Sequence, residues 1–348
     1  MQTLGRRDFL KTVIIGGAML SLDGAFEAQH VDASHLDLKS MGECKKVTIT
    51  CISEVGWWDN QVMLADLGKA GGPKNAEQWS GEWTPANAAG SCSLVEVDSL
   101  SGNKIRFLVD TGWDAKYMDE RFKAEGVDRM LQNGEIDFLY ITHEHLDHFW
   151  GLEAVLKYNP EIKIIIPSTF QPVAMSYLDG KDFPRAGARN SIAHKGSLTK
   201  FRVGETTKLM DGVVSVGFDI PIVLKVRGEQ SLFFNVRDAG LVLFTGCCHQ
   251  NITTFADYAV NMLSAGGKLY GLYGGLHLAP FGNLGDEERG LIEKIGSYGF
   301  KKIAANHCTG LPAVQKMLEL GYPVVRGNGS KGSKSDLYIG NGDWVSFG

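Results

Sequence analysis

The sequence predicts an α/β fold. Short apolar, β-branched runs that are typical of buried strands alternate along the chain with segments of helical periodicity. The chain has nine histidines, and histidine follows the ends of four of these predicted strands, at His143, His249, His277 and His307. Open α/β sheets keep their ligand sites at the carboxyl ends of the strands, so we expect these side chains to converge on one site.

Bulk composition is that of a soluble globular protein. The 348 residues are 44% hydrophobic and 22% charged, with a formal net charge of −5. No proline-rich or charge-rich linker divides the chain, so we predict one domain over residues 40–348. Lysine and arginine are scattered, and we therefore expect no nucleic-acid partner.

The N-terminus resembles a twin-arginine export signal. Arg6 and Arg7 precede the apolar stretch 13–22, which is too short and too rich in glycine and alanine to span a bilayer stably. We assign the signal to residues 1–28, with cleavage after Ala28; the alternative is an amphipathic first helix with two surface arginines. The expected location is periplasmic or extracytoplasmic, with no stable membrane anchor after export. Such signals serve folded proteins, so a metal could be loaded before export.

A tryptophan-rich segment interrupts the first strands. Residues 46–55 predict a strand, and residues 57–90 then hold four of the seven tryptophans. A connection of this length is usually functional or disordered, and tryptophan argues against disorder, so we interpret it as a flap over the site. The alternative is an ordered excursion packed on the core. Strands at 93–97 and 105–109 and a helix at 115–131 follow.

The loop 142–148, which follows the predicted strand 136–141, carries the densest cluster of candidate ligands. Residues two apart point the same way in extended chain, so His143 and His145 can bind one metal while Asp147 and His148 turn toward a second. Imidazole with carboxylate favours zinc, with iron or manganese as alternatives, over calcium or magnesium. The competing interpretation is a solvated polar turn with histidines by chance.

The middle of the chain supplies a third ligand. We expect helices at 149–158 and 170–178, strands at 163–167, 207–218, 231–236 and 241–246, and an irregular stretch at 179–196. Cys247, Cys248 and His249 follow the last of these strands, and His249 is the predicted third ligand of the first metal. The roles of the two cysteines stay open among a donor behind the ligands, small buried hydrophobes and, as the less favoured alternative, metal ligands. His194 is interpreted as a surface histidine.

The last part of the chain completes the second metal set. We expect helices at 251–263 and 286–298 and strands at 269–273 and 302–305. His307 follows the final strand and is the predicted completing ligand for the second metal, beside Asp147 and His148. His277 could coordinate, bind substrate or pack structurally. The tail from residue 331 is expected to end in an edge hairpin.

The motif HxHxDH at residues 143–148 resembles the signature of the metallo-β-lactamase superfamily. The resemblance implies a four-layer αβ/βα sandwich, one or two metals along one edge, and hydrolysis by a metal-bound hydroxide. A matching Asp-Thr-Gly in the family lies beneath the metals, which assigns Asp110 to orienting the ligand histidines. Many members bridge the metals with an aspartate near the position of His277. None stands in residues 274–278, so occupancy by a single metal stays open.

Three further motifs narrow the resemblance. TGCCH, GGLHL and NHCTG, together with ITHEHLDH, are similar to the branch named for the dihydropterin–ribofuranosylaminobenzene phosphate synthase of methanopterin synthesis. The similarity runs from about Thr48 to Gly310, and members usually show serine where Cys248 stands. An export signal fits poorly with a cytoplasmic pterin pathway, so the fold and metal ligands carry over but that reaction does not.

The expected function is therefore a metal-dependent hydrolase of a small ester, phosphoester, lactone, amide or sulfate ester. Asp147 would bind metal and also orient the hydroxide or shuttle its proton. No G-x-S-x-G motif suggests a serine route. The alternatives are a pterin-like small-molecule binding protein without turnover and a transferase joining a pterin to an aminobenzene phosphate. The six cysteines fit an oxidising compartment, but their spacing predicts no disulfide framework.

Overall fold

The computed structural model describes residues 20–22, 26–31, 38–262 and 268–348. Most of the predicted signal, residues 1–19 and 23–25, lies outside the described residues, so the export prediction is not addressed by the structure. In the described part of this region, β1 (Leu20–Leu22) pairs with β2 (Phe26–Val31), and β2 pairs with β9 (Thr206–Met210).

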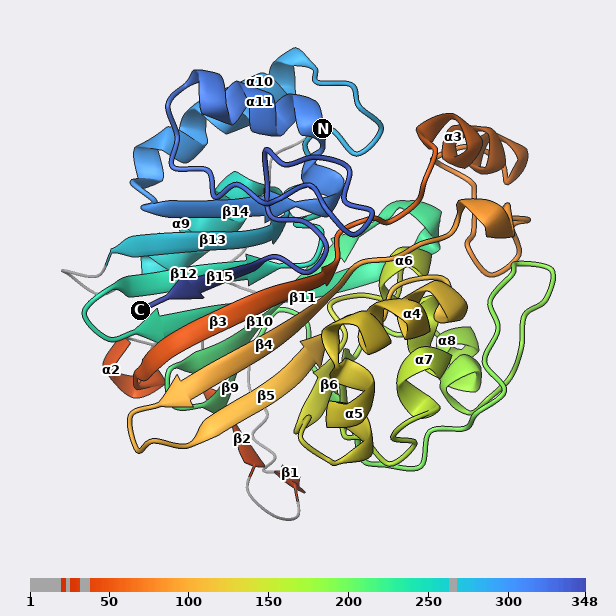
Figure 1. Cartoon of the computed structure of the whole chain (residues 1–348), viewed down its shortest axis with the longest axis horizontal. Helices are drawn as coiled ribbons and strands as arrows, with labels where there is room; N and C mark the ends of the chain where they lie inside the picture. Colours follow the sequence, from red (N-terminus) through yellow and green to blue (C-terminus); the bar gives the residue numbers. More distant parts are fainter. Residues whose placement is uncertain (1–19, 23–25, 32–37, 263–267) are drawn as a thin grey trace.

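The remaining strands form two halves of one continuous, strongly twisted sheet (Figure 1). The first half holds β3 (Cys44–Ser53), β4 (Cys92–Ser99), β5 (Lys104–Val109), β6 (Phe138–Tyr140), β7 (Ile164–Pro167), β8 (Leu198–Phe201) and β15 (Trp344–Phe347). The second half holds β9 (Thr206–Met210), β10 (Val213–Pro221), β11 (Arg227–Val236), β12 (Gly240–Thr245), β13 (Leu269–Gly275) and β14 (Lys302–Asn306). The halves meet where β11 pairs with β3 at Val236 and Cys44. Strands β5 to β8, and separately β12 to β14, run parallel, so within each set the carboxyl ends share one edge.

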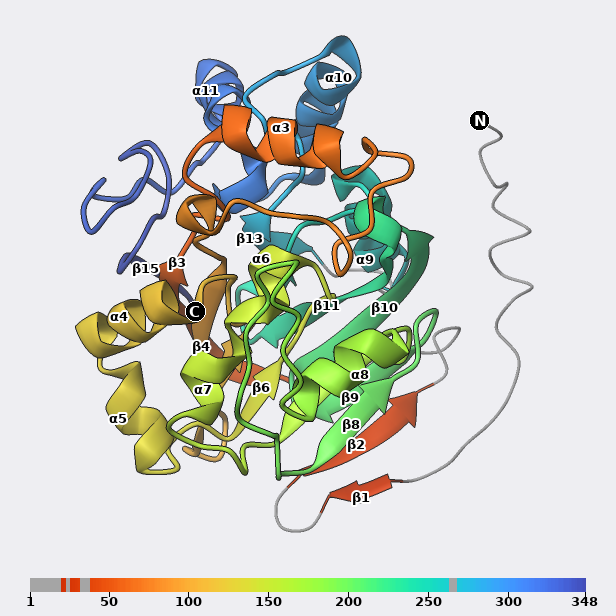
Figure 2. The same cartoon turned by 90° about the vertical axis from the view of Figure 1, so that its right-hand side faces the viewer.

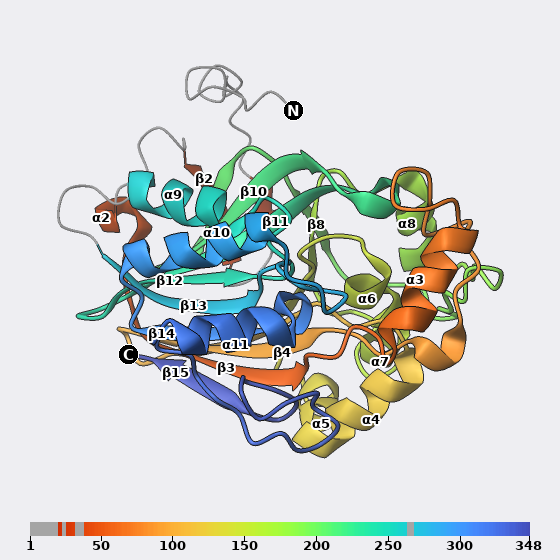
Figure 3. The ribbon, with the colours of Figure 1, turned by 90° about the horizontal axis from the view of Figure 1, so that it is seen from above.

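Helices cover the two outer faces. On the first half lie α4 (Ala115–Glu125), α5 (Val127–Gln132), α6 (Leu146–Phe149), α7 (Glu153–Leu156) and α8 (Pro172–Leu178), as Figure 2 shows. On the second half lie α9 (Ile252–Met262), α10 (Asp286–Ile295) and α11 (Leu311–Glu319), seen from above in Figure 3. Two further helices, α2 (Leu38–Met41) and α3 (Asn60–Lys69), precede these. Short 3-10 turns lie at Pro85–Asn87, Trp150–Leu152, Val223–Lys225, Gly296–Tyr298 and His307–Thr309.

Three buried hydrophobic clusters fill the three spaces between these four layers. Alternate residues of a strand point to opposite faces, so Leu139 of β6 joins the cluster under α4 to α8, while Phe138 and Tyr140 face the other sheet. In β11, Phe233 likewise packs under α9 to α11 and Phe234 packs between the sheets. This layering confirms the predicted αβ/βα sandwich.

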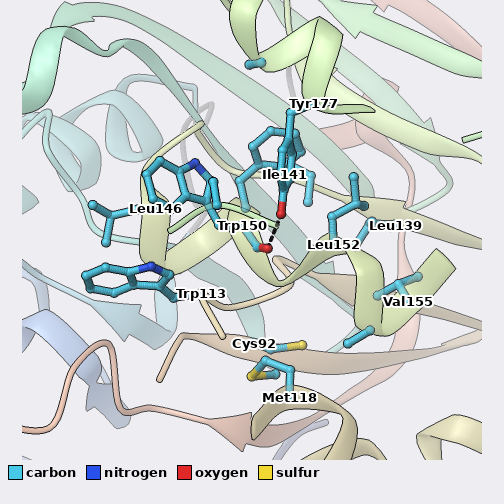
Figure 4. Packing of buried hydrophobic residues seen from close by; sticks show 14 of the residues in the cluster. Cys92, Trp113, Met118, Leu139, Ile141, Leu146, Trp150, Leu152, Val155 and Tyr177 are labelled. Atoms are coloured by element: carbon cyan, nitrogen blue, oxygen red, sulfur yellow. Dashed lines mark hydrogen bonds between the residues drawn. The ribbon is translucent and has the colours of Figure 1, made fainter. Parts of the chain in front are cut away.

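The cluster under the first-half helices is dense in aromatic rings. Figure 4 shows Trp113, Trp150 and Tyr177 gathered over Leu139 and Ile141 of the β6 region, with the Tyr177 hydroxyl donating to the carbonyl of Trp150. The loop 142–148, called the metal loop below, follows β6 directly, so packing in this cluster holds the start of the loop in place.

Four expected elements differ in the structure. The expected helix 149–158 is a 3-10 turn at Trp150–Leu152 followed by the four-residue helix α7. The expected helix 115–131 is two helices, because Gly126 takes a left-handed φ of 74° that ends α4. The expected strand 207–218 is likewise two strands, β9 and β10, with Gly212 at φ 78° in the turn between them. The predicted edge hairpin after residue 331 is wrong: β15 is a lone strand that pairs antiparallel with β3, a long-range partner that local patterns do not reveal.

The tryptophan-rich segment 57–90 packs on the core. Trp57, Trp79 and Trp83 are buried, and the Trp79 ring lies 5.0 Å from that of Trp150. Trp58 is 44% exposed. The structure therefore shows an ordered segment, and its movement as a flap stays a prediction. Within the described residues, no helix combines the length and apolar character needed to cross a membrane.

Candidate metal centre

The predicted metal loop is buried at the end of β6. Its ligand candidates His143, His145, Asp147 and His148 are each at most 5% exposed. Helix α6 begins at Leu146 with His145 as its N-cap residue, so Asp147 and His148 lie in a first helical turn while His143 stays on the extended side. The loop therefore changes from strand to helix between its two pairs of candidates.

His249 joins His143 and His145. The nitrogens of these three imidazoles lie within 4.8 Å of one another, and the His249 ring centroid lies 5.0 Å from each of the other two. The Nε2 atom of His249 is buried and has no hydrogen-bond partner. A buried, unpartnered nitrogen is costly unless something binds it, so this group fits a cation.

His307 joins Asp147 and His148 in a second group of the same size. His307 Nε2 lies 3.1 Å from His148 Nε2 and 3.4 Å from the Asp147 carboxylate. The structure thus brings together the two sets of three that the sequence predicts, although the second set spans 160 residues.

In each of four histidines, one ring nitrogen is hydrogen-bonded to an oxygen atom outside the donor groups. The other ring nitrogen is then free to face the other members of its donor group. These contacts are His143 Nδ1 with Thr142 Oγ1 (2.9 Å), His145 Nε2 with the Val223 carbonyl (3.0 Å), His148 Nδ1 with Asp110 Oδ2 (2.6 Å) and His307 Nδ1 with the Glu54 carbonyl (3.1 Å). Such outer contacts fix ring orientation and tautomer in metal sites.

Asp110 lies beneath the loop, in the position assigned to it from the sequence. Its carboxylate accepts the Nδ1–H of His148 and both the backbone N–H (2.7 Å) and the hydroxyl of Thr142. It is 2% exposed. One buried carboxylate therefore holds both the start and the end of the metal loop.

The electrostatics of the centre favour neutral imidazoles in the first group. Burial lowers the pKa of His145 to about 4 and the pKa values of His143 and His249 well below their usual range. Burial acts against ionisation of Asp147, but the charges of His148 and His307 hold its pKa well below the usual range. For His148, burial lowers the pKa, and Asp147 with Asp110 overcomes this and raises it to about 9. The centre thus contains free imidazole lone pairs beside a carboxylate.

Glu229 is a site residue that the sequence reasoning missed. It is completely buried in β11, and its carboxylate accepts the backbone N–H groups of Cys247, Cys248 and His249 at 2.7 to 2.9 Å. Burial raises its pKa, and these three donors act in the opposite direction. An acidic residue in an otherwise buried strand was the signal available in the sequence.

Cys247 and His277 also lie at the centre. Cys247 Sγ is 3.1 Å from His148 Nε2, whereas the Cys248 side chain packs in the hydrophobic cluster under α9 to α11. The His277 ring lies 4.4 Å from that of His249, and its Nδ1 is buried without a partner. His194 is bonded to the Ile162 carbonyl and belongs to none of the donor groups found among the described residues. All six cysteines are free thiols.

Left-handed backbone is concentrated at this centre. Asp110 (φ 63°), Cys248 (60°), His277 (49°) and His307 (51°) all adopt it without being glycine. Each such residue costs about 1–3 kcal/mol, and such strain persists where the surrounding structure holds it in place, commonly at functional sites.

Part of the chain is similar to a known protein family. Residues 87–247 match the family model described as the metallo-beta-lactamase superfamily, and this segment contains the whole metal loop. The match agrees with the resemblance that the motifs indicate, and the four-layer architecture confirms the predicted fold.

The chain is also similar to a named enzyme. It is 28% identical over 292 residues to the 7,8-dihydropterin-6-methyl-4-(beta-D-ribofuranosyl)-aminobenzene-5'-phosphate synthase of Methanocaldococcus jannaschii, covering 74% of this chain and 94% of that protein. A solved structure described as a metal-dependent hydrolase of the beta-lactamase superfamily matches with 19% identity, a TM-score of 0.49, and coverage of 87% of this chain and 98% of that one. A metallo-beta-lactamase of Cronobacter sakazakii with a HARLDQ motif matches with 15% identity, a TM-score of 0.33, and coverage of 66% and 76%.

Proposed function

We propose that this protein is a metal-dependent hydrolase of a small ester, phosphoester, lactone or amide. The observation that carries the proposal is the pair of adjacent three-residue donor groups, His143, His145 and His249 beside Asp147, His148 and His307. The four loop residues are buried, and His249 and His307 are partly buried. The first group offers three imidazoles and the second offers two imidazoles and a carboxylate, donors that suit zinc, with iron or manganese as alternatives. The superfamily match supports this class of reaction.

The donor groups fit two divalent cations, which when bound lower the pKa of water and stabilise developing negative charge. The chain's own residues then have distinct roles. Asp147 would help to hold the second cation and would orient the attacking water or shuttle its proton. Asp110 keeps His148 in the tautomer with a proton on Nδ1. Trp57 limits access of water, since it stacks on Phe281 at 5.5 Å and lies edge-on to His307 at 6.5 Å.

Elemental analysis of purified protein, with a hydrolase substrate panel, tests the proposal. His145→Ala removes a nitrogen from the first donor group and should lose both bound metal and activity. His194→Ala is the matched control, because His194 belongs to neither group. Full hydrolysis by metal-replete His145→Ala protein would contradict the proposed site.

A second candidate is the transferase reaction, because the named relative is a synthase. Incubation with a dihydropterin and a ribofuranosylaminobenzene phosphate distinguishes the two. A product containing both substrates would favour the transferase, and hydrolysis of a single ester would favour the hydrolase. Heterocycle binding without either product would support the binding-protein alternative.

We also propose that the protein is exported through its twin-arginine segment. The support is the sequence Arg6-Arg7 ahead of a short apolar stretch. Replacing both arginines by lysine should leave the protein in the cytoplasm with its N-terminus uncut. Periplasmic recovery of that variant would reject the assignment.

A further inference from the structure

Cys247 lies between the two donor groups. Five groups of donors in the described residues could hold a cation, and Cys247 belongs to three of them: with His143 and His148, with His249 and His277, and with His307 and Cys308. Within each group the donor atoms lie within 4.8 Å of one another. Its Sγ therefore reaches nitrogens of both proposed metal sets.

The backbone holds the thiol in this place. Cys247 follows β12 directly after Gly246, and its N–H is fixed by the Glu229 carboxylate at 2.9 Å. Gly246 lies so close to Thr142 that a Cβ there would stand 2.4 Å from the threonine hydroxyl oxygen. The β12 end is therefore seated against the start of the metal loop, and the thiol is 3% exposed.

The other two nearby thiols do not share this position. Cys248 belongs to none of the donor groups, and its side chain packs among apolar residues. Cys308 belongs to one group only, and its Sγ contacts the Cys247 carbonyl at 3.6 Å. Two nearby nitrogens, His249 Nε2 and His277 Nδ1, are buried without hydrogen-bond partners.

We propose that Cys247 is a metal ligand whose thiolate bridges the two cations. The inference rests on the two-metal centre of the proposed function. That centre has no ligand common to both cations among the six residues assigned to it, and Cys247 would be that ligand. Asp147 is the one carboxylate in the donor groups found among the described residues, and it belongs only to the second set. On binding, the thiol proton passes to solvent and the sulfur forms bonds to both cations. Because a thiolate is a soft ligand, it raises the affinity of the site for zinc or cobalt(II) relative to manganese.

Cobalt(II) titration of the metal-free, reduced full-length protein tests this without any assay of activity. Thiolate bound to cobalt(II) gives an intense near-ultraviolet charge-transfer band, which imidazole and carboxylate ligands do not give. We expect the band in wild type and in the matched control Cys248→Ser. Cys247→Ser should bind cobalt(II) but lose the band.

The outcomes separate this inference from the proposed function. If wild type binds cobalt(II) with no such band, the thiolate ligand is rejected and the metal-dependent hydrolase stands. If the band survives in Cys247→Ser and disappears in Cys308→Ser, the bridging assignment is overturned. If no cobalt(II) or zinc binds, both proposals fall.

If Cys247→Ser does not fold, a measurement on protein that keeps Cys247 can still test the ligand. X-ray absorption of the zinc-loaded Cys308→Ser protein should show a sulfur neighbour at about 2.3 Å from zinc. A shell of nitrogen and oxygen alone would overturn the inference.

Discussion

Asp110→Asn is the substitution that most directly tests how the centre is held. Asparagine matches aspartate in shape and tolerates the left-handed φ of 63° at this position, so the backbone need not move. The carboxylate accepts from Thr142 at one end and from His148 and Thr142 at the other. An amide has one acceptor oxygen, so one end must present a donor to another donor.

The size of the effect follows from these contacts. Loss of an outer partner of a ligand histidine typically costs about 10- to 100-fold in metal affinity, or about 1.4–2.7 kcal/mol. The unsatisfied buried donor should also destabilise the metal-free protein by about 1–3 kcal/mol. We expect the weakening to concentrate in the cation held by His148, since His148 Nδ1 is the nitrogen that Asp110 binds.

The assay is competition for zinc against a chelator of known affinity, paired with urea unfolding of the metal-free protein. Asp114→Asn is the control, because Asp114 caps α4 by accepting the Tyr117 N–H, and asparagine caps equally well. Wild-type affinity for both cations in Asp110→Asn would refute the reasoning that this carboxylate positions the ligand.

Glu229→Gln should lower the free energy of unfolding by about 1–3 kcal/mol in a urea titration, because the amide nitrogen that replaces one carboxylate oxygen must face a backbone N–H donor. The substitution should also weaken zinc binding at His249. Gly151→Ala places a Cβ 2.1 Å from a backbone carbonyl oxygen and should lower the melting temperature, whereas Gly68→Ala in α3 meets nothing within 4 Å and should raise stability by about 0.4–1 kcal/mol. Asp119 has its pKa held at about 2 by lysine and tyrosine hydrogen bonds that outweigh burial. Its stabilisation is therefore present above the unfolded aspartate pKa of about 3.9 and lost as pH falls toward 2, so Asp119→Asn should flatten the stability–pH curve over that interval; an unchanged slope would contradict the shift.

The sequence predicts this site well where its residues follow local rules. Apolar runs indicate strands β6, β12 and β14. Because β12 and β14 end at a common edge, His249 and His307 could be placed together, and the motif at residues 143–148 linked them to the loop of His143. The order of strands and helices followed from periodicity for the same reason.

Features set by distant partners could not be predicted. The sequence does not reveal the role of Glu229, because that role depends on three backbone N–H groups more than fifteen residues away. The central position of Cys247 depends on how the two halves dock, and spacing alone does not separate it from Cys248. The pairing of β15 with β3 joins opposite ends of the chain, and a local hairpin pattern cannot reveal it.

Each donor group draws on both halves of the sandwich. His143, His145, Asp147 and His148 come from the first half, whereas His249 and His307 come from the second half, in a part of the chain that is synthesised later. With these ligand sets, neither half alone can bind a cation tightly. Bound cations would therefore cross-link the two halves of the sandwich. A nascent chain that ends before residue 307 cannot assemble the second set, so binding of the second cation would follow synthesis of nearly the whole polypeptide.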